Sequence, residues 1–137
     1  MKKKILIVCA DYYKDIATDL CKDSISVLKK NKINNFKVIK VPGVFEIPVL
    51  ISSNIKKYNA FIALGCVIKG ETPHFDFISK ATTNALINLT IIHKKPIGNG
   101  ILTCLTYKQA KFRSEPKGKK RKGVEAANAA LSVLKKI

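Results

Sequence analysis

The chain has 137 residues, of which 47% are hydrophobic and 26% are charged, so residues 1–137 have the size and composition of a single domain. No apolar run reaches the ~18 residues that a membrane span needs. The basic start MKKKILIVCADYY differs from a signal peptide, because its apolar stretch is short and ends at Asp11. We therefore expect a cytoplasmic protein with no membrane partner.

The formal net charge of +17 raises the alternative of a nucleic-acid-binding protein. However, the 26 basic residues are 24 lysines and 2 arginines, spread along most of the chain. Surfaces that read bases use arginine and clustered aromatic side chains, whereas this sequence has no tryptophan and no RRM, KH or zinc-finger motif. The one dense cluster, KGKKRK at 117–122, is typical of a solvated loop. We interpret the charge as a lysine-rich surface, with a non-enzymatic nucleic-acid binder as the alternative.

The four cysteines show no C-x-x-C pairing. Cys9, Cys66 and Cys104 lie in or beside apolar runs, where unpaired cysteine is common. The sequence therefore predicts neither a disulfide framework nor a metal site.

The first half of the chain alternates strand and helix patterns. The β-branched run 4–10 predicts a strand that is buried on both faces. Apolar residues at helical spacing from position 16 to about 30 predict a helix, and 36–41 predicts a second strand. A helical stripe covers 47–55, with Pro48 in its first turn, where proline is tolerated.

The second half continues the alternation. We predict a strand over 60–68, a long helix from 75 to 92, a strand over 96–105, a short helix over 107–113 and a last helix over 124–134. This order implies a parallel sheet covered by helices on both faces. The predicted fold is an α/β flavodoxin-like three-layer α/β/α sandwich with a four-stranded parallel sheet.

Polar and aromatic residues gather where the predicted strands end, which is where parallel sheets bind ligands. His74 can transfer protons near neutral pH, and Glu46 can accept hydrogen bonds. Lys69 and Thr72 precede a helix start that favours an anion. Tyr12 or Tyr13 can stack on a flat ring.

Each of these residues also has a structural interpretation. His74 can simply begin a helix, and Glu46 can be a carboxylate stabilised by a helix dipole. Dinucleotide, P-loop and nucleophile-elbow motifs are absent from the sequence. The residues alone therefore leave the chemistry open.

Four segments resemble the 6,7-dimethyl-8-ribityllumazine synthase family. VPGVFEIPVL (41–50) resembles the family segment V-P-G-[AS]-[FY]-E-[IL]-P, and LGCVIKGETPHFDFIS (64–79) resembles L-G-x-V-I-[RK]-G-x-T-x-H-[FY]-[DE]-[FY]-[IV]. PIGNGILTCLTYKQA (96–110) is similar to P-V-x-x-G-[IV]-L-T-x-x-x-x-x-Q-A, and KGVEAANAAL (122–131) to the N-K-G-x-[ED]-A-A-x-[AT]-A-L tail. The segments keep the family's order and cover most of the chain.

The resemblance implies the penultimate step of riboflavin biosynthesis. 5-Amino-6-(D-ribitylamino)uracil would condense with 3,4-dihydroxy-2-butanone 4-phosphate, with release of inorganic phosphate and without a metal or organic cofactor. A lumazine- or flavin-binding relative that no longer catalyses is a further alternative.

The resemblance also implies roles for individual residues. His74 would be the proton-transferring catalytic residue. The residues expected to contact the pyrimidine and the ribityl chain are Tyr12, Val44, Phe45, Glu46, Cys66, Val67, Ile68, Asn99 and Lys122. The residues expected on the phosphate side are Lys69, Glu71, Thr72 and Arg113.

The family places its site between neighbouring subunits, so Asn99, Arg113 and Lys122 would come from the adjacent copy. We expect a free homopentamer rather than a shell of sixty subunits. Three positions depart from the family pattern: Asn99 stands where an aromatic residue is frequent, Arg121 replaces the Asn of N-K-G, and the segment Asp11–Tyr13 leaves Tyr12 or Tyr13 as the stacking residue.

Overall fold

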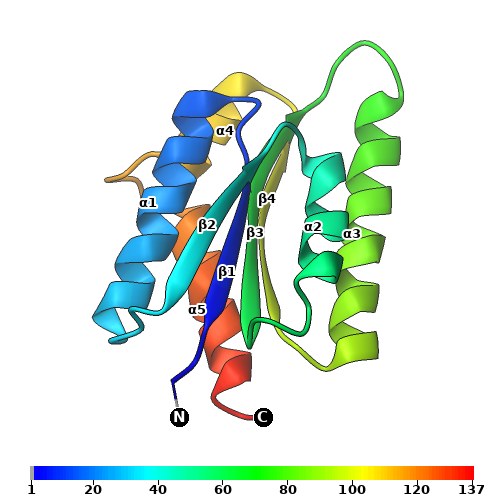
Figure 1. The fold of residues 1–137 in the computed structure, drawn as a ribbon. Helices are drawn as coiled ribbons and strands as arrows, with labels where there is room; N and C mark the ends of the chain where they lie inside the picture. Colours follow the sequence, from blue (N-terminus) through cyan, green and yellow to red (C-terminus); the bar gives the residue numbers. More distant parts are fainter. Residues whose placement is uncertain (1) are drawn as a thin grey trace.

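A four-stranded parallel sheet forms the centre of the computed structural model, which describes residues 2–137 (Figure 1). The strand order is β2-β1-β3-β4, and each neighbouring pair is parallel. The strands are β1 (Ile5–Ala10), β2 (Phe36–Val41), β3 (Ala60–Ile68) and β4 (Ile97–Cys104). The structure confirms the predicted α/β sandwich and its four-stranded sheet.

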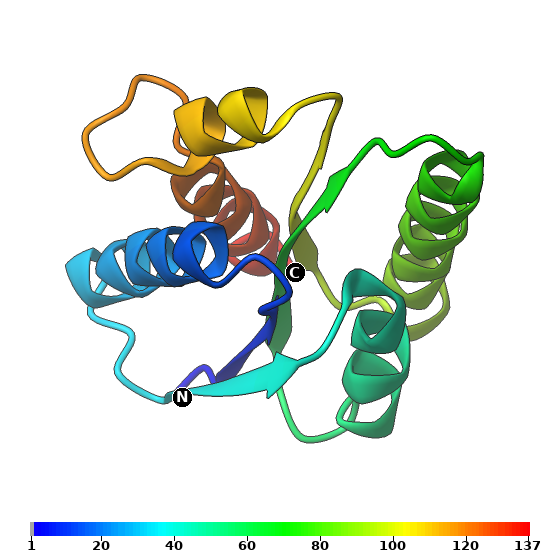
Figure 2. The same cartoon turned by 90° about the horizontal axis from the view of Figure 1, so that it is seen from above.

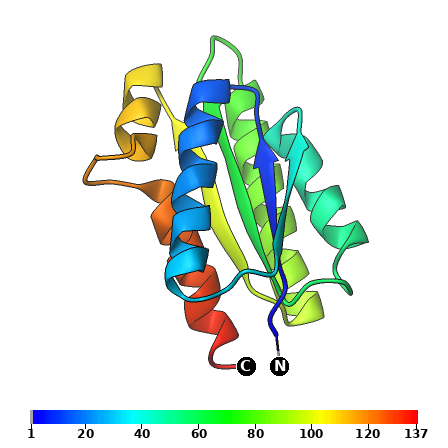
Figure 3. The ribbon, with the colours of Figure 1, turned by 60° about the vertical axis from the view of Figure 1, so that its left-hand side comes forward.

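Helices cover both faces of the sheet (Figure 2). One face carries α1 (Lys14–Lys30), α4 (Tyr107–Ser114) and α5 (Lys122–Leu134), and Figure 3 shows α1 in front of the sheet. The other face carries α2 (Ile47–Ser53) and α3 (His74–His93). A 3-10 turn at Val44–Glu46, which the sequence analysis did not predict, leads into α2. Among residues 2–137, none of the helices combines the length and the apolar character needed to cross a membrane.

The central strand β1 is buried on both faces, as its composition predicts. Ile5 and Ile7 pack toward α1 and α5, whereas Leu6 and Val8 pack toward α2. All four side chains are fully buried, and each stabilises the fold by roughly 1.5–3 kcal/mol relative to an exposed position. Every second residue of a strand points to the same face, so one apolar run supplies both cores.

The long helix α3 differs from this pattern. Its only buried residues are Thr82 and Leu86, while Phe77, Ile91 and Ile92 are 69%, 68% and 70% exposed. The predicted apolar stripe does form a helix, but Ile92 lies outside the core of the single chain. The contacts of α3 with the core end at the half-buried Leu89, so the last turn with Ile92 stays uncovered.

Helix α5 approaches the edge strand β4 very closely. A Cβ atom at Gly98 would lie 2.0 Å from the carbonyl oxygen of Ala126, so only glycine fits there. The side chain of Asn99, one residue later, therefore points away from α5. This contact fixes α5 against the first residues of β4.

Candidate active site

A cleft of about 730 Å³ opens at the carboxyl ends of β1, β2 and β3. We call it the histidine cleft. Its lining residues are Tyr12, Tyr13, Gly43, Val44, Phe45, Glu46, Cys66, Val67, Ile68, Gly70, Thr72, His74, Phe75 and Ile78. The prediction that polar and aromatic residues meet at the strand ends is therefore correct for these segments.

The end of β3 contributes the apolar wall of this cleft. Cys66 is buried, and Val67 and Ile68 are half-buried. Burial raises the pKa of the Cys66 thiol to about 12, with smaller contributions from Cys104 and Asp15. A thiol with that pKa stays protonated near neutral pH and is a poor nucleophile.

Two tyrosines stand at the end of β1. Tyr12 is 74% exposed, and its ring meets the Tyr13 ring edge-on, with centroids 5.0 Å apart. Tyr13 is half-buried and lies 6.4 Å from the Tyr107 ring, and burial is the main cause that raises the pKa of its hydroxyl. Both rings line the cleft, but Tyr12 has the larger free surface on which a flat ring can stack.

The 3-10 turn after β2 places three neighbouring side chains in environments of different burial. Val44 is buried in the core beneath the cleft, whereas Phe45 is 63% exposed. The half-buried Glu46 lies beside Gly43, where its Oε1 would be 3.2 Å from a Cβ atom. The turn thus presents a carboxylate and an aromatic ring to the same space.

His74 is the first residue of α3, one residue earlier than predicted. Its backbone N–H donates to the Thr72 hydroxyl oxygen at 3.4 Å, and Pro73 stands at the N-cap position without a side-chain cap. The His74 side chain is exposed and lines the cleft. It can therefore reach a bound substrate as a proton donor or acceptor.

The loop between β3 and α3 arches above the sheet (Figure 1). The backbone N–H of Lys69 donates to the Cys104 carbonyl oxygen at 2.9 Å, which fixes the base of the loop. The side chains of Lys69 and Glu71 are exposed and lie outside the lining of the histidine cleft.

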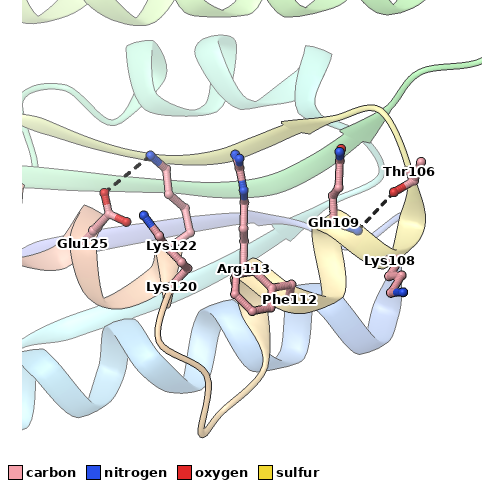
Figure 4. A pocket seen from close by; sticks show the side chains of 8 residues that line it. All are labelled: Thr106, Lys108, Gln109, Phe112, Arg113, Lys120, Lys122 and Glu125. Carbon is pink, nitrogen blue, oxygen red and sulfur yellow. Dashed lines mark hydrogen bonds and ion pairs between the residues drawn. The ribbon is translucent and has the colours of Figure 1, made fainter.

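A second cleft, of about 670 Å³, lies between α4 and the start of α5 (Figure 4). We call it the arginine cleft. Its lining residues are Thr106, Lys108, Gln109, Phe112, Arg113, Lys120, Lys122 and Glu125. Four of them are cations, and the single carboxylate is Glu125, whose Oε1 lies 3.9 Å from the Lys122 ammonium. The cleft is thus strongly attractive to an anion.

Two side-chain hydrogen bonds fix the start of α4. The Thr106 hydroxyl oxygen accepts the Gln109 backbone N–H at 3.2 Å, and the Gln109 side chain accepts the Leu105 N–H at 2.8 Å. Arg113 follows Gln109 by four residues and lies on the same helix face. In Figure 4, the side chains of Gln109, Arg113 and Lys122 extend in the same direction.

The sequence analysis missed Lys108, Gln109 and Lys120 as lining residues of the arginine cleft. The T-x-x-Q spacing at 106–109 is a sequence signal that could have indicated the cap. For Lys120, no local signal separates it from the other lysines of the 117–122 segment.

Asn99 lies in neither cleft. It is exposed on the edge strand β4, and its side-chain oxygen accepts the Ile101 backbone N–H at 3.1 Å. Within residues 2–137 there is also no group of three or more His, Cys, Asp or Glu side chains arranged to hold a metal ion.

Comparison with known proteins bears on the whole chain. A sequence model of the 6,7-dimethyl-8-ribityllumazine synthase family matches residues 2–137. The chain belongs to this family. The synthase of Bartonella bacilliformis is 42% identical over 134 residues, which cover 95% of this chain and 87% of that protein.

Two further relatives give the same result. A protein of Rhodopseudomonas palustris named 6,7-dimethyl-8-ribityllumazine synthase 1 is 41% identical, covering 96% of this chain and 84% of its own length. The synthase of Cutibacterium acnes is 38% identical, covering 96% and 80% respectively. The family resemblance stated from the four sequence segments is therefore confirmed.

In this lumazine synthase chain, most of the predicted site residues line one of the two clefts, and three of them line neither. Arg113 and Lys122 line the arginine cleft, and Lys69, Glu71 and Asn99 line neither cleft. The predicted residues that line the histidine cleft are Tyr12, Val44, Phe45, Glu46, Cys66, Val67, Ile68, Thr72 and His74. A single chain thus brings His74 together with aromatic side chains and the Glu46 carboxylate, in a cleft lined by no lysine or arginine.

Proposed function

We propose that this chain catalyses the condensation of 5-amino-6-(D-ribitylamino)uracil with 3,4-dihydroxy-2-butanone 4-phosphate in riboflavin biosynthesis. The products are 6,7-dimethyl-8-ribityllumazine, inorganic phosphate and two molecules of water. The observation that carries this proposal is the family match over residues 2–137.

The histidine cleft fits the pyrimidine substrate. The exposed Tyr12 ring and Phe45 offer flat surfaces for a heterocycle, and the Glu46 carboxylate can accept hydrogen bonds from ribityl hydroxyls. The backbone at Val67 and Ile68 can contact the edge of the ring. These residues orient the amino group that becomes the nucleophile.

His74 supplies the proton transfers of the reaction. The amine attacks the ketone carbon, and the carbonyl oxygen leaves as water after protonation, which gives an imine. Loss of a proton next to the imine then expels phosphate, and the second amine closes the ring with loss of the second water. An imidazole can both donate and accept protons near neutral pH.

Arg113 and Lys122 are proposed to bind the substrates from a second copy of the chain. Arg113 can hold the phosphate group through paired N–H donors, and Lys122 adds a cation at the start of α5. Lys69, Glu71 and Thr72 would lie on the phosphate side of the adjoining histidine cleft. Asn99 would face the pyrimidine from the neighbouring edge strand.

The uncovered face of α3 supports an assembly of copies. Phe77, Ile91 and Ile92 are more than two-thirds exposed, and an apolar surface of this kind marks an interaction site. We infer a homopentamer in the cytoplasm, in which each histidine cleft meets the arginine cleft of a neighbour. A sedimentation coefficient near that of a sixty-subunit shell would contradict the pentamer.

The direct test is a fluorescence assay with the purified oligomer and both substrates. Lumazine fluorescence should rise faster than in a protein-free mixture, because the uncatalysed condensation gives the background rate. A rate equal to that background would contradict the proposed function.

A further inference from the structure

An ion pair joins α1 to the segment before α5, outside the lining of both clefts. The Arg121 guanidinium donates to both carboxylate oxygens of Asp23, at 2.6 Å and 3.2 Å. The Asp23 side chain is only 5% exposed, whereas the Arg121 side chain is 37% exposed. The two residues are 98 positions apart in the sequence, so this contact is a property of the fold.

Two neighbouring contacts hold the same junction. The Ser24 hydroxyl donates to the Gly123 carbonyl oxygen at 2.7 Å, and this bond is buried. A Cβ atom at Gly123 would lie 2.3 Å from the Leu20 carbonyl oxygen, so the start of α5 touches the backbone of α1. Asp23 is therefore one of three α1 residues that fix where α5 begins.

The residues on either side of Arg121 point the other way. Lys120 and Lys122 both line the arginine cleft, whereas Arg121 does not. The backbone of Arg121 is extended, with φ −100° and ψ 93°, and successive side chains of an extended segment point to opposite sides. Holding Arg121 against α1 consequently turns its two neighbours toward Arg113.

Charge repulsion makes such an anchor necessary. The arginine cleft contains Lys108, Arg113, Lys120 and Lys122 against a single carboxylate. Like charges that face one cleft repel each other, and the start of a helix also disfavours cations. Without a fixed partner for Arg121, this repulsion would move Lys120 and Lys122 away from Arg113.

We propose that Asp23 is a positioning residue: by holding Arg121 on α1, it keeps Lys120 and Lys122 in the arginine cleft beside Arg113, where the three cations bind the phosphate group of a small dianionic substrate. This inference rests on the proposed function. It adds Lys120 to the cations of the site and gives a role to a carboxylate that touches no substrate.

The substitution Asp23→Asn tests the proposal because two explanations predict opposite signs. If Asp23 acted only through its charge, the substitution would make the region more positive, and phosphate would bind more tightly. If Asp23 acts by positioning, phosphate binds more weakly. We expect KM for 3,4-dihydroxy-2-butanone 4-phosphate to rise about fivefold to tenfold.

Titration of the pentamer with inorganic phosphate, followed by calorimetry, separates this inference from the proposed function, because it needs no turnover. The dissociation constant should rise by the same factor in Asp23→Asn. An unchanged or lower constant would overturn the positioning role, even if the wild-type protein makes lumazine. If the wild-type protein formed no lumazine, while the phosphate dissociation constant still rose in Asp23→Asn, the proposed function would be overturned instead.

A second variant keeps the test decisive if Asp23→Asn does not fold. Arg121→Gln removes the same ion pair by changing its less buried partner. The control Lys119→Gln removes a positive charge two residues earlier, outside the cleft lining. Arg121→Gln should weaken phosphate binding at least fivefold more than Lys119→Gln does. Equal effects of the two variants would show that charge alone matters and would overturn the proposal.

Discussion

The two clefts of this chain differ in almost every chemical respect. The lining of the histidine cleft contains one imidazole, one carboxylate, aromatic rings and no lysine or arginine. The lining of the arginine cleft contains four cations and no histidine. One cleft suits a flat heterocycle and proton transfer, and the other suits an anion.

The clefts are also built by different means. Strand ends form the histidine cleft, so the buried sheet sets the positions of Val44 and Cys66. Helix α4 and the start of α5 form the arginine cleft, and its geometry depends on the cap at Thr106 and on contacts between α1 and α5. The proposed reaction needs both kinds of cleft at once. We propose that two copies of the chain provide them, one cleft from each copy.

The largest expected effect comes from the histidine cleft. His74→Ala should reduce kcat by about 10²–10⁴, because the variant loses its general acid–base group. The measurement is the fluorescence assay corrected for the uncatalysed rate. His93→Ala, at the other end of α3, is the matched control, and an unaltered kcat in His74→Ala would remove the residue from the mechanism.

The corresponding change in the arginine cleft should act on binding. Arg113→Ala should raise KM for the phosphate-bearing substrate by about 10-fold to 100-fold, because a charged hydrogen bond contributes roughly 1.5–3 kcal/mol. Lys111→Ala removes a cation from the same helix, where it pairs with Asp15 at 3.4 Å outside the cleft lining. If both variants gave the same KM, the assignment of Arg113 would be wrong.

Substitutions at two glycines should distinguish the tightly packed junction of α1 and α5 from the open loop between β3 and α3. Gly123→Ala forces a Cβ atom to within 2.3 Å of the Leu20 carbonyl oxygen, and overpacking of this kind lowers the free energy of unfolding by about 1–3 kcal/mol. Gly70→Ala has no heavy atom within 4 Å of the new Cβ, so its free energy of unfolding should stay within about 0.5 kcal/mol. Urea denaturation of both variants measures the difference, and equal midpoints would show that α1 and α5 have room to separate.

The last prediction concerns the Cys66 thiol, whose pKa burial raises to about 12 from an ordinary 9.0. A raised folded-state pKa stabilises the fold fully below pH 9, and this stabilisation disappears as the pH rises toward 12. At pH 8 we expect iodoacetamide to alkylate Cys66 on the order of a hundredfold more slowly than a free cysteine. Mass spectrometry of the folded protein follows this rate, and rapid labelling would show that the thiol is ionised and reactive.

The fold could be predicted from sequence because its signals are local. The apolar runs of β1 and β3 and the helical spacing of α1 each indicate one element, and the alternation of elements restricts the topology. Element ends were predicted to within a few residues; the start of α5 at Lys122 rather than 124 is one example. Contacts with α1 fix this start, and helix periodicity does not report them.

The site was only partly accessible from sequence. Motifs identified His74 and Arg113, but their separation into two clefts depends on how α4 and α5 pack against α1. The contact between Asp23 and Arg121 joins residues 98 positions apart, and no spacing rule reports such a pair. The positions of Asn99, Lys69 and Glu71 relative to a substrate depend on a neighbouring copy, which remains a prediction.

Co-assembly of two impaired variants, assayed at a concentration of the phosphate-bearing substrate well below KM of Arg113→Ala, tests the central claim most directly. His74→Ala and Arg113→Ala are unfolded together, mixed in equal amounts, refolded and assayed. If each site takes its imidazole from one copy and its guanidinium from the next around a closed ring, about a quarter of the sites regain both groups, and about a quarter of wild-type activity returns. If the mixture is no more active than the two variants alone, the clefts of neighbouring copies do not form a shared site.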